Sequence, residues 1–231
     1  MPRVTKRRSV LPQDEVVGFF TRLWEVVKQN RKLALLGIGG LALLVLVLSL
    51  TTFLQNRRKD QARAALAQVR PLLSQADQVE EALKALERVL ADYPNTPPAK
   101  EAALFRAHLL YQQKKYDQAA KAYEDLLRTL DESERQGLDL LIAESLSYCY
   151  EALGDFHRAA TALAPPLEKG TGPQQGELLR RVAWLYEKAG NNKEAARYWR
   201  KLLERPPTPA LVPYLKEKLA ALGPEPGKDK P

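Results

Sequence analysis

The sequence contains little of the chemistry from which active sites and metal centres are built. Its 231 residues include one cysteine, Cys149, and two histidines, His108 and His157. A single cysteine excludes an intramolecular disulfide, and the two histidines have no suitable ligands nearby in the sequence to complete a zinc site. No phosphate-binding loop and no GxSxG, HExxH or CxxC motif occurs. We therefore predict a protein that is not an enzyme and has no cofactor, no metal and no small-molecule substrate.

Charge is absent from one long stretch, residues 33–54, which also lacks Pro, Asn and Gln. Fourteen of its 22 residues are Leu, Ile, Val or Phe, and a helix of this length spans about 33 Å, slightly more than a bilayer core of about 30 Å. Basic residues at 31–32 and 57–59 flank it. We predict a transmembrane helix. The alternative is a core helix of a soluble domain, but such a helix rarely stays apolar on every face.

The first 32 residues carry eight of the Lys and Arg residues against three acidic ones. The rest of the chain has no basic stripe, which argues against nucleic-acid binding. Within this basic tail, residues 13–30 place apolar side chains at helical spacing. They predict an amphipathic helix that either lies in the membrane interface or docks on a membrane partner. No small-residue cleavage site ends the apolar stretch, so an uncleaved anchor is favoured over a removed signal peptide.

Residues 55–223 are rich in Ala, Leu, Glu, Lys, Arg and Gln with a 3.6-residue periodicity, which predicts an all-helical domain. Turn signals recur along it, and so does an alanine early in every second predicted helix, at intervals of 37, 40 and 36 residues. A large apolar residue follows each of these alanines by four positions, and a small residue precedes three of them by about twelve. The predicted repeat-packing residues are Ala82, Ala107, Ala119, Tyr123, Ser147, Ala159, Leu163, Ala183, Ala195 and Trp199.

This pattern resembles the tetratricopeptide repeat, a helix-turn-helix unit, most closely in residues 115–124 and 190–199. The resemblance implies an all-α fold: about four helix pairs stacked as an α-solenoid over 55–223, closed by a capping helix at 209–222. A disordered tail is expected at 224–231. The first unit is degenerate at Arg70-Pro71, and Pro165-Pro166 is expected to kink or end a helix. An irregular helical bundle is the alternative.

In such repeats the first helices of the units line a concave groove. The repeat register assigns to it a ladder of planar and polar side chains, which would suit the binding of a peptide. The alternative is that the rings pack on the neighbouring helix. The predicted groove residues are Leu104, His108, Tyr111, Gln112, Glu144, Tyr148, Glu151, Arg180, Trp184, Glu187 and Lys188.

The order of elements also resembles the YfgM-type ancillary subunit of the bacterial Sec translocon. The likeness lies in the acidic-aromatic segment at 14–20, the basic residues before the span, the Gln-Asn-Arg-Arg-Lys exit and the repeats. It implies an inner-membrane protein with a cytoplasmic N-terminus and a periplasmic domain that meets Sec subunits, chaperones or exported chains. An adaptor for envelope assembly or cell division is an alternative. A cytoplasm-facing adaptor is another, because basic residues close to the span favour the reverse orientation.

Overall fold

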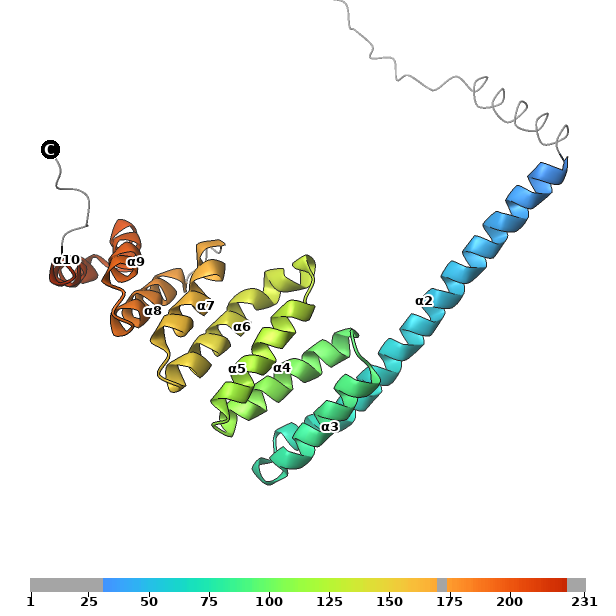
Figure 1. Ribbon diagram of the computed structural model, residues 1–231, viewed down its shortest axis with the longest axis horizontal. Helices are drawn as coiled ribbons and strands as arrows, with labels where there is room; N and C mark the ends of the chain where they lie inside the picture. Colours follow the sequence, from blue (N-terminus) through green and yellow to red (C-terminus); the bar gives the residue numbers. More distant parts are fainter. Residues whose placement is uncertain (1–30, 170–173, 224–231) are drawn as a thin grey trace, which may run out of the picture. The chain divides into compact units, whose positions relative to one another are not determined.

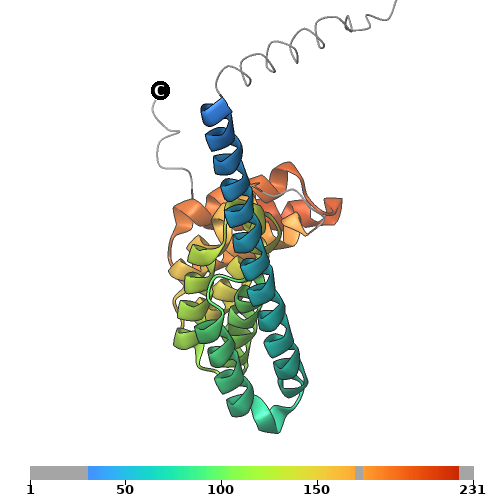
Figure 2. The ribbon, with the colours of Figure 1, turned by 90° about the vertical axis from the view of Figure 1, so that its right-hand side faces the viewer.

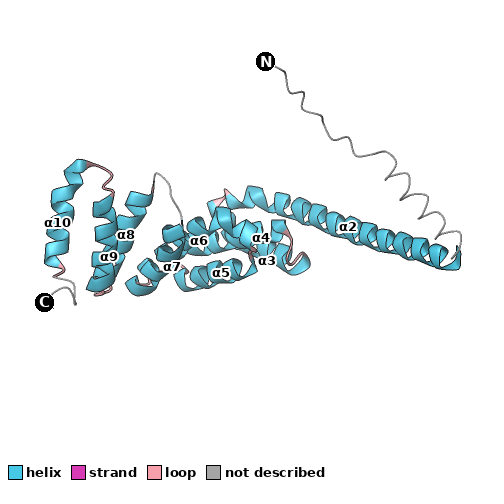
Figure 3. Cartoon of the chain, turned by 90° about the horizontal axis from the view of Figure 1, so that it is seen from above, coloured by secondary structure: helices cyan, strands magenta, loops and turns pink. Residues whose placement is uncertain are grey.

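The structure, a computed structural model, describes residues 31–169 and 174–223. The predicted amphipathic helix at 13–30 and the tail at 224–231 lie outside the described residues. Every regular element in the described ranges is a helix (Figure 3), so the all-α prediction is confirmed. The helices are α2 (Arg31–Leu73), α3 (Val79–Asp92), α4 (Pro97–Gln112), α5 (Tyr116–Thr129), α6 (Glu132–Ala152), α7 (Phe156–Lys169), α8 (Gln175–Lys188), α9 (Asn192–Glu204) and α10 (Val212–Ala221), with 3-10 turns at Ala76–Gln78 and Pro209–Leu211.

The chain divides into two compact units, Met1–Arg57 and Arg58–Pro231, and helix α2 contributes residues to both. In the first unit the large apolar side chains of α2 are exposed, from Val47 at 47 % to Leu36 at 72 %. Among the described residues, this helix alone is long and apolar enough to cross a membrane, and none of its most apolar window is buried within the protein. A core helix of a soluble domain would be mostly buried.

The second unit is a stack of helix pairs in chain order (Figure 1). Residues 58–73 of α2 lie beside α3, and Arg58 donates a hydrogen bond to the carbonyl oxygen of Asp92 at 3.3 Å. The pairs α4–α5, α6–α7 and α8–α9 follow, and α10 packs on the last of them. Viewed from the side, the helices of the stack lie next to one another rather than end to end (Figure 2). Each pair therefore buries its apolar faces against its neighbours in the sequence.

Small residues bring the paired helices together. The four alanines near the starts of α3, α5, α7 and α9 are completely buried, as are the small residues of α4, α6 and α8 that face them. All ten repeat-packing residues lie in the interior, each at most 2 % exposed. The bulkiest of them, Tyr123, Leu163 and Trp199, fill the space between consecutive pairs. Close packing of this kind leaves little tolerance for added or removed volume at these positions.

Side-chain caps define where several helices begin. Thr96 starts α4 by accepting a hydrogen bond from the N–H three residues later, at 3.3 Å. Asp131 starts α6 in the same way at 2.9 Å, and the carboxylate of Glu134 accepts a hydrogen bond from the Asp131 N–H at 3.0 Å. Asn191 caps α9 at 3.2 Å. These oxygens satisfy N–H groups that have no partner within the first helical turn.

Three of the turns inside helix pairs have the same backbone geometry. Lys114, Gly154 and Gly190 occupy equivalent positions with φ of 61°, 78° and 73°. In each turn, the next residue donates its N–H to a carbonyl five positions back, at 2.9 Å. This is a left-handed helix terminus, for which glycine is the favoured residue because it has no Cβ. The α4–α5 turn is therefore strained relative to the other two.

Replacing Lys114 by glycine should stabilise the protein by about 1 kcal/mol, because the strain of a side chain at positive φ disappears. The reciprocal control, Gly154→Ala, should destabilise it by a similar amount. Chemical denaturation of both variants measures the two effects. A loss of stability in Lys114→Gly would contradict the assignment of strain to this turn.

Of the two outcomes expected at Pro165-Pro166 in the third pair, a kink or an end of the helix, the structure excludes the end. Helix α7 contains Pro165 and Pro166 and nevertheless continues to Lys169, so the helix does not end at the two prolines. Leu163 and Leu167 lie on either side of them and are 0 % and 3 % exposed. We attribute the continuation to this burial, which holds the last turn against the core although two backbone N–H donors are missing.

A short helix closes the stack. The predicted capping segment at 209–222 forms the 3-10 turn and then α10, whose Leu215 is completely buried. The outward-facing residues of α10 include Lys216 and Glu217, which are exposed. A terminal helix with one buried apolar residue and a polar outer side ends the stack without leaving an unpartnered apolar face.

Candidate functional site

The candidate site is the surface formed by α4, α6 and α8, which we call the first-helix face. The eleven residues that the repeat register selected come from these three helices, and each of them is at least partly exposed. His108, Gln112, Tyr148, Arg180 and Lys188 are exposed. The half-buried members are Leu104, Tyr111, Glu144, Glu151, Trp184 and Glu187.

Helix α6 and its C-terminal cap carry most of the exposed large hydrophobic side chains of the described repeat unit. Four large hydrophobic side chains are exposed in the described part of this unit, and Leu141, Tyr148 and Leu153 are on α6 or at its C-terminal cap. Leu141 is 50 % exposed and Tyr148 is 39 % exposed. They are seven residues apart and so share one face of the helix. An exposed apolar stripe on an otherwise well-packed unit indicates a contact surface for another molecule.

Sequence reasoning selected Tyr148 but missed Leu141. Leu141 lies seven residues before Tyr148, so helical periodicity connects the two. Periodicity alone does not reveal, however, that this leucine points away from the core, since leucine and alanine are the two commonest buried residues of the repeats. Leu141 is exposed because of the way α6 packs, with its neighbours Ile142 and Leu146 among the buried side chains of that helix.

The ring of Tyr148 is held by contacts on two sides. The guanidinium carbon of Arg181 lies over the ring at 3.9 Å from its centroid. The Tyr148 hydroxyl donates a hydrogen bond to the Glu144 carboxylate at 3.2 Å. Arg181 also forms an ion pair with Glu151 at 2.5 Å, with only 19 % and 28 % of the two side chains exposed. The ring is therefore fixed in orientation, and partial burial raises the pKa of its hydroxyl.

Arg181 is a site residue that the sequence analysis did not select. The repeat register selected its neighbour Arg180, whose guanidinium instead pairs with Glu177 on the same helix at 2.5 Å. Adjacent residues of a helix point about 100° apart, so a shift of one position exchanges a surface arginine for one that reaches the preceding first helix. A pair of consecutive arginines in the sequence gives no signal that separates these roles.

Trp184 and Glu187 have partners beyond their own helix. The Trp184 ring packs edge-on against Phe156 at the start of α7, with centroids 6.1 Å apart, and Lys188 lies 5.6 Å from it. The Glu187 carboxylate accepts hydrogen bonds from the Trp199 indole at 2.5 Å and from Lys218 at 2.8 Å. Part of the Trp184 ring is therefore exposed to solvent. Glu187 instead contacts α9 and α10 at the C-terminal end of the stack.

Residues of α4 on this face contact one another and the start of α5. His108 and Gln112 form a side-chain hydrogen bond of 3.0 Å, and Tyr111 packs edge-on against Tyr116 at 5.3 Å.

Within the described residues, no group of three His, Cys, Asp or Glu side chains is placed to hold a metal ion. Burial raises the pKa of the Cys149 thiol to about 11, so the thiol is protonated at neutral pH.

Ion pairs connect consecutive first helices at every junction of the stack. Each pair joins one helix to the next in the order α2, α4, α6, α8 and α10, at distances between 2.5 and 2.9 Å. Arg70–Glu101 is exposed, and such a pair contributes only about 0–1 kcal/mol. The side chains of the other three pairs are partly buried. The pairs are Arg70–Glu101, Lys100–Glu134, Arg181–Glu151 and Lys218–Glu187.

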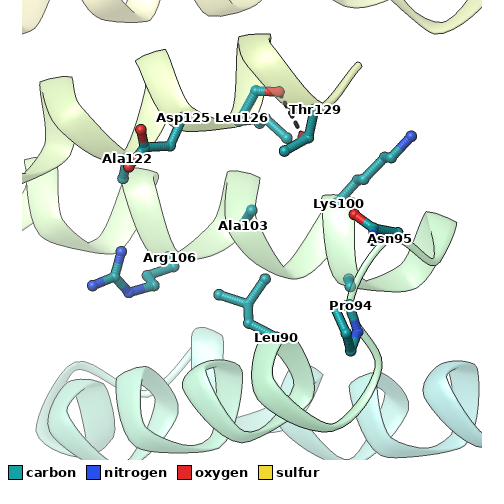
Figure 4. Close-up of a pocket in the computed structure, with 11 residues that line it drawn as sticks. Leu90, Pro94, Asn95, Lys100, Ala103, Arg106, Ala122, Asp125, Leu126 and Thr129 are labelled. Carbon is teal, nitrogen blue, oxygen red and sulfur yellow. Dashed lines mark hydrogen bonds between the residues drawn. The ribbon is translucent and has the colours of Figure 1, made fainter. Parts of the chain in front are cut away.

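A pocket of about 300 Å³ lies on a different side, where α3 and α5 flank α4. Figure 4 shows Leu90 and Pro94 below the gap, Ala103 on the middle helix and Leu126 above it. A similar pocket of about 270 Å³ lies between α5 and α7. The first pocket is lined by both apolar and polar residues, among them Asn95 and Asp125, and Arg106 at its edge is paired with Glu87 at 3.3 Å. Both are gaps between neighbouring second helices.

The tetratricopeptide repeat family matches this sequence at residues 71–134 and 149–210, which together exceed half of the chain. No curated protein matches it. The kinesin light chain crystal structure from Podosopora anserina, with nearly identical TPR-like repeats, is 19 % identical over 71 % of this chain and 86 % of that one, with a TM-score of 0.48. BtubC (BKLC) from P. vanneervenii is 17 % identical over 73 % of this chain and 82 % of that one, with a TM-score of 0.43.

Proposed function

Because this chain belongs to the tetratricopeptide repeat family, a family of protein–protein interaction scaffolds, we propose that it is a membrane-anchored scaffold that holds protein partners on its first-helix face. The observation that carries the proposal is the exposed stripe of Leu141 and Tyr148 on α6. An extended segment of a partner could contact this stripe along the face, and the partly exposed Trp184 would extend the contact onto α8. Aromatic side chains contribute strongly to such interfaces.

The exposed apolar part of α2 supports the anchor. Its described leucines and valines are exposed, and in water this would be an unusually large apolar surface. In a bilayer the same surface is covered by lipid. Anchoring confines the repeats to a thin layer at the membrane, which raises the effective concentration of partners there and makes weak contacts sufficient.

For the partner we propose the Sec translocon, periplasmic chaperones or the exported chains themselves, with the N-terminus in the cytoplasm. The order of elements supports this assignment: a basic tail, an apolar span, a basic exit and then the repeats. The eight basic residues of the first 32 favour a cytoplasmic tail, and large domains cross the membrane largely regardless of their charge.

A cytoplasm-facing adaptor is a second candidate, and the basic residues after the span favour it. Arg57, Arg58, Arg63 and Arg70 are all exposed, and positive charge close to a span is typical of the cytoplasmic side. An envelope-assembly or cell-division adaptor would share the first orientation and differ only in its partner.

Two measurements test the proposal. An alkaline phosphatase fusion after Pro231 should be active, and a cytoplasm-dependent reporter at the same place inactive, if the repeats are periplasmic. A photoreactive amino acid at Leu141 should crosslink to Sec subunits or exported chains, whereas one at Lys216 on α10 serves as the control and should not. An active cytoplasm-dependent reporter would exclude a periplasmic repeat domain and favour the cytoplasm-facing adaptor. Capture of division proteins at Leu141 would favour the envelope adaptor.

A further inference from the structure

The strongest remaining feature of the first-helix face is the Glu144 carboxylate beside Tyr148. Five glutamates on α4, α6 and α8 have a basic partner. Glu144 is half-buried and accepts a hydrogen bond from the Tyr148 hydroxyl, but within the described part of the chain it has no salt bridge to Lys or Arg. The paired carboxylates are Glu101, Glu134, Glu151, Glu177 and Glu187.

The local charge around Tyr148 is therefore negative. Glu144 and Glu151 contribute two negative charges, and Arg181 supplies the single positive charge that pairs with Glu151. Because Arg181 covers one side of the Tyr148 ring, the exposure of the side chain comes from the rest of the ring. An aromatic face next to an unpaired carboxylate is an environment that attracts a cation.

Leu141 adds an apolar contact three residues before Glu144 on the same helix. It is 50 % exposed, and positions three and four apart are neighbours on a helix surface. The stripe therefore presents, in order along α6, an apolar side chain, a carboxylate and an aromatic ring. This arrangement is complementary to a partner segment in which a basic side chain lies next to apolar ones.

We propose that the first-helix face selects protein segments carrying a lysine or arginine flanked by apolar residues, with the basic group bound between Glu144 and the open side of Tyr148. This inference rests on the proposed function and names the class of segment that the scaffold holds. Arg181 acts as a positioning residue, because it orients the ring and neutralises Glu151 without contacting the segment.

The test uses the full-length protein in nanodiscs and three pools of fluorescent seven-residue peptides. The pools share the same mixture of Leu, Phe, Ala and Ser and differ only in the central residue, which is Lys, Gln or Glu. The Lys pool should bind about tenfold more tightly than the Glu pool at low salt. In Glu144→Gln this preference should fall to about twofold, and in the matched control Glu177→Gln it should remain.

The outcomes separate this inference from the function on which it rests. Equal binding of all three pools, or a preference for Glu, would overturn the selection of basic segments while leaving a peptide-binding scaffold. If no pool binds even at millimolar concentration, the peptide-binding face itself is wrong. Retention of the full Lys preference in Glu144→Gln would show that another group provides the selectivity, and the assignment to Glu144 would then be abandoned. Circular dichroism of each variant checks that the helices are intact.

Discussion

Replacing Leu43 and Leu44 together by arginine should release the protein from the membrane fraction. Both leucines are more than half exposed on α2, near the middle of the apolar stretch at 33–54. The fourteen large apolar residues of this stretch favour insertion by roughly 4–8 kcal/mol in total, and two arginines at the centre cost about 5–7 kcal/mol. The two terms nearly cancel, so insertion should be largely lost.

Alkaline carbonate extraction followed by immunoblotting measures the change, since it strips peripheral proteins and leaves integral ones in the pellet. The matched control is the double substitution of the same leucines by isoleucine, which retains hydrophobicity and should stay in the membrane. If the arginine variant also remained in the pellet, the apolar part of α2 would not be the anchor. Release of the unmodified protein by carbonate would contradict anchoring altogether.

Substituting Trp199 by alanine should destabilise the repeat unit far more than the same change at Trp184. Trp199 is 1 % exposed, donates a hydrogen bond to Glu187 and packs edge-on against Tyr214 at 6.1 Å. Its loss leaves a large cavity at the junction of α8, α9 and α10, which costs about 3–5 kcal/mol. For a unit of this size, that corresponds to a fall in melting temperature of about 10 °C.

Trp184 is the matched control because it is the same residue type on the neighbouring helix. It is half-buried and touches Phe156 at its edge, so Trp184→Ala should cost about 1 kcal/mol. Thermal unfolding followed by circular dichroism measures both variants. Equal losses would mean that Trp184 is as much a core residue as Trp199, which would remove it from the candidate binding face.

The packing residues were accessible to sequence reasoning because repetition makes them visible. An alanine that recurs at nearly constant spacing, such as Ala119 and Ala159, marks a place where two backbones approach closely, and both are completely buried. The charged partners on the surface were not accessible in this way. Glu144 and Glu151 have similar positions in the repeat register. Glu151 nevertheless forms an ion pair with Arg181 across the junction between α6 and α8, whereas Glu144 accepts a hydrogen bond from Tyr148 on its own helix.

By itself, the sequence determined that the chain is all-helical, that its repeats pack through small residues and that one stretch is too apolar to be an ordinary surface helix. These properties follow from the amino-acid composition and from the regular spacing of apolar and small residues, both of which are local features of the sequence. Only the tertiary structure decided that Leu141 points outwards, that Arg181 rather than Arg180 bridges two pairs and that α7 continues past its prolines. Those outcomes depend on which helix lies opposite each side chain, and that information exists only once the pairs are stacked.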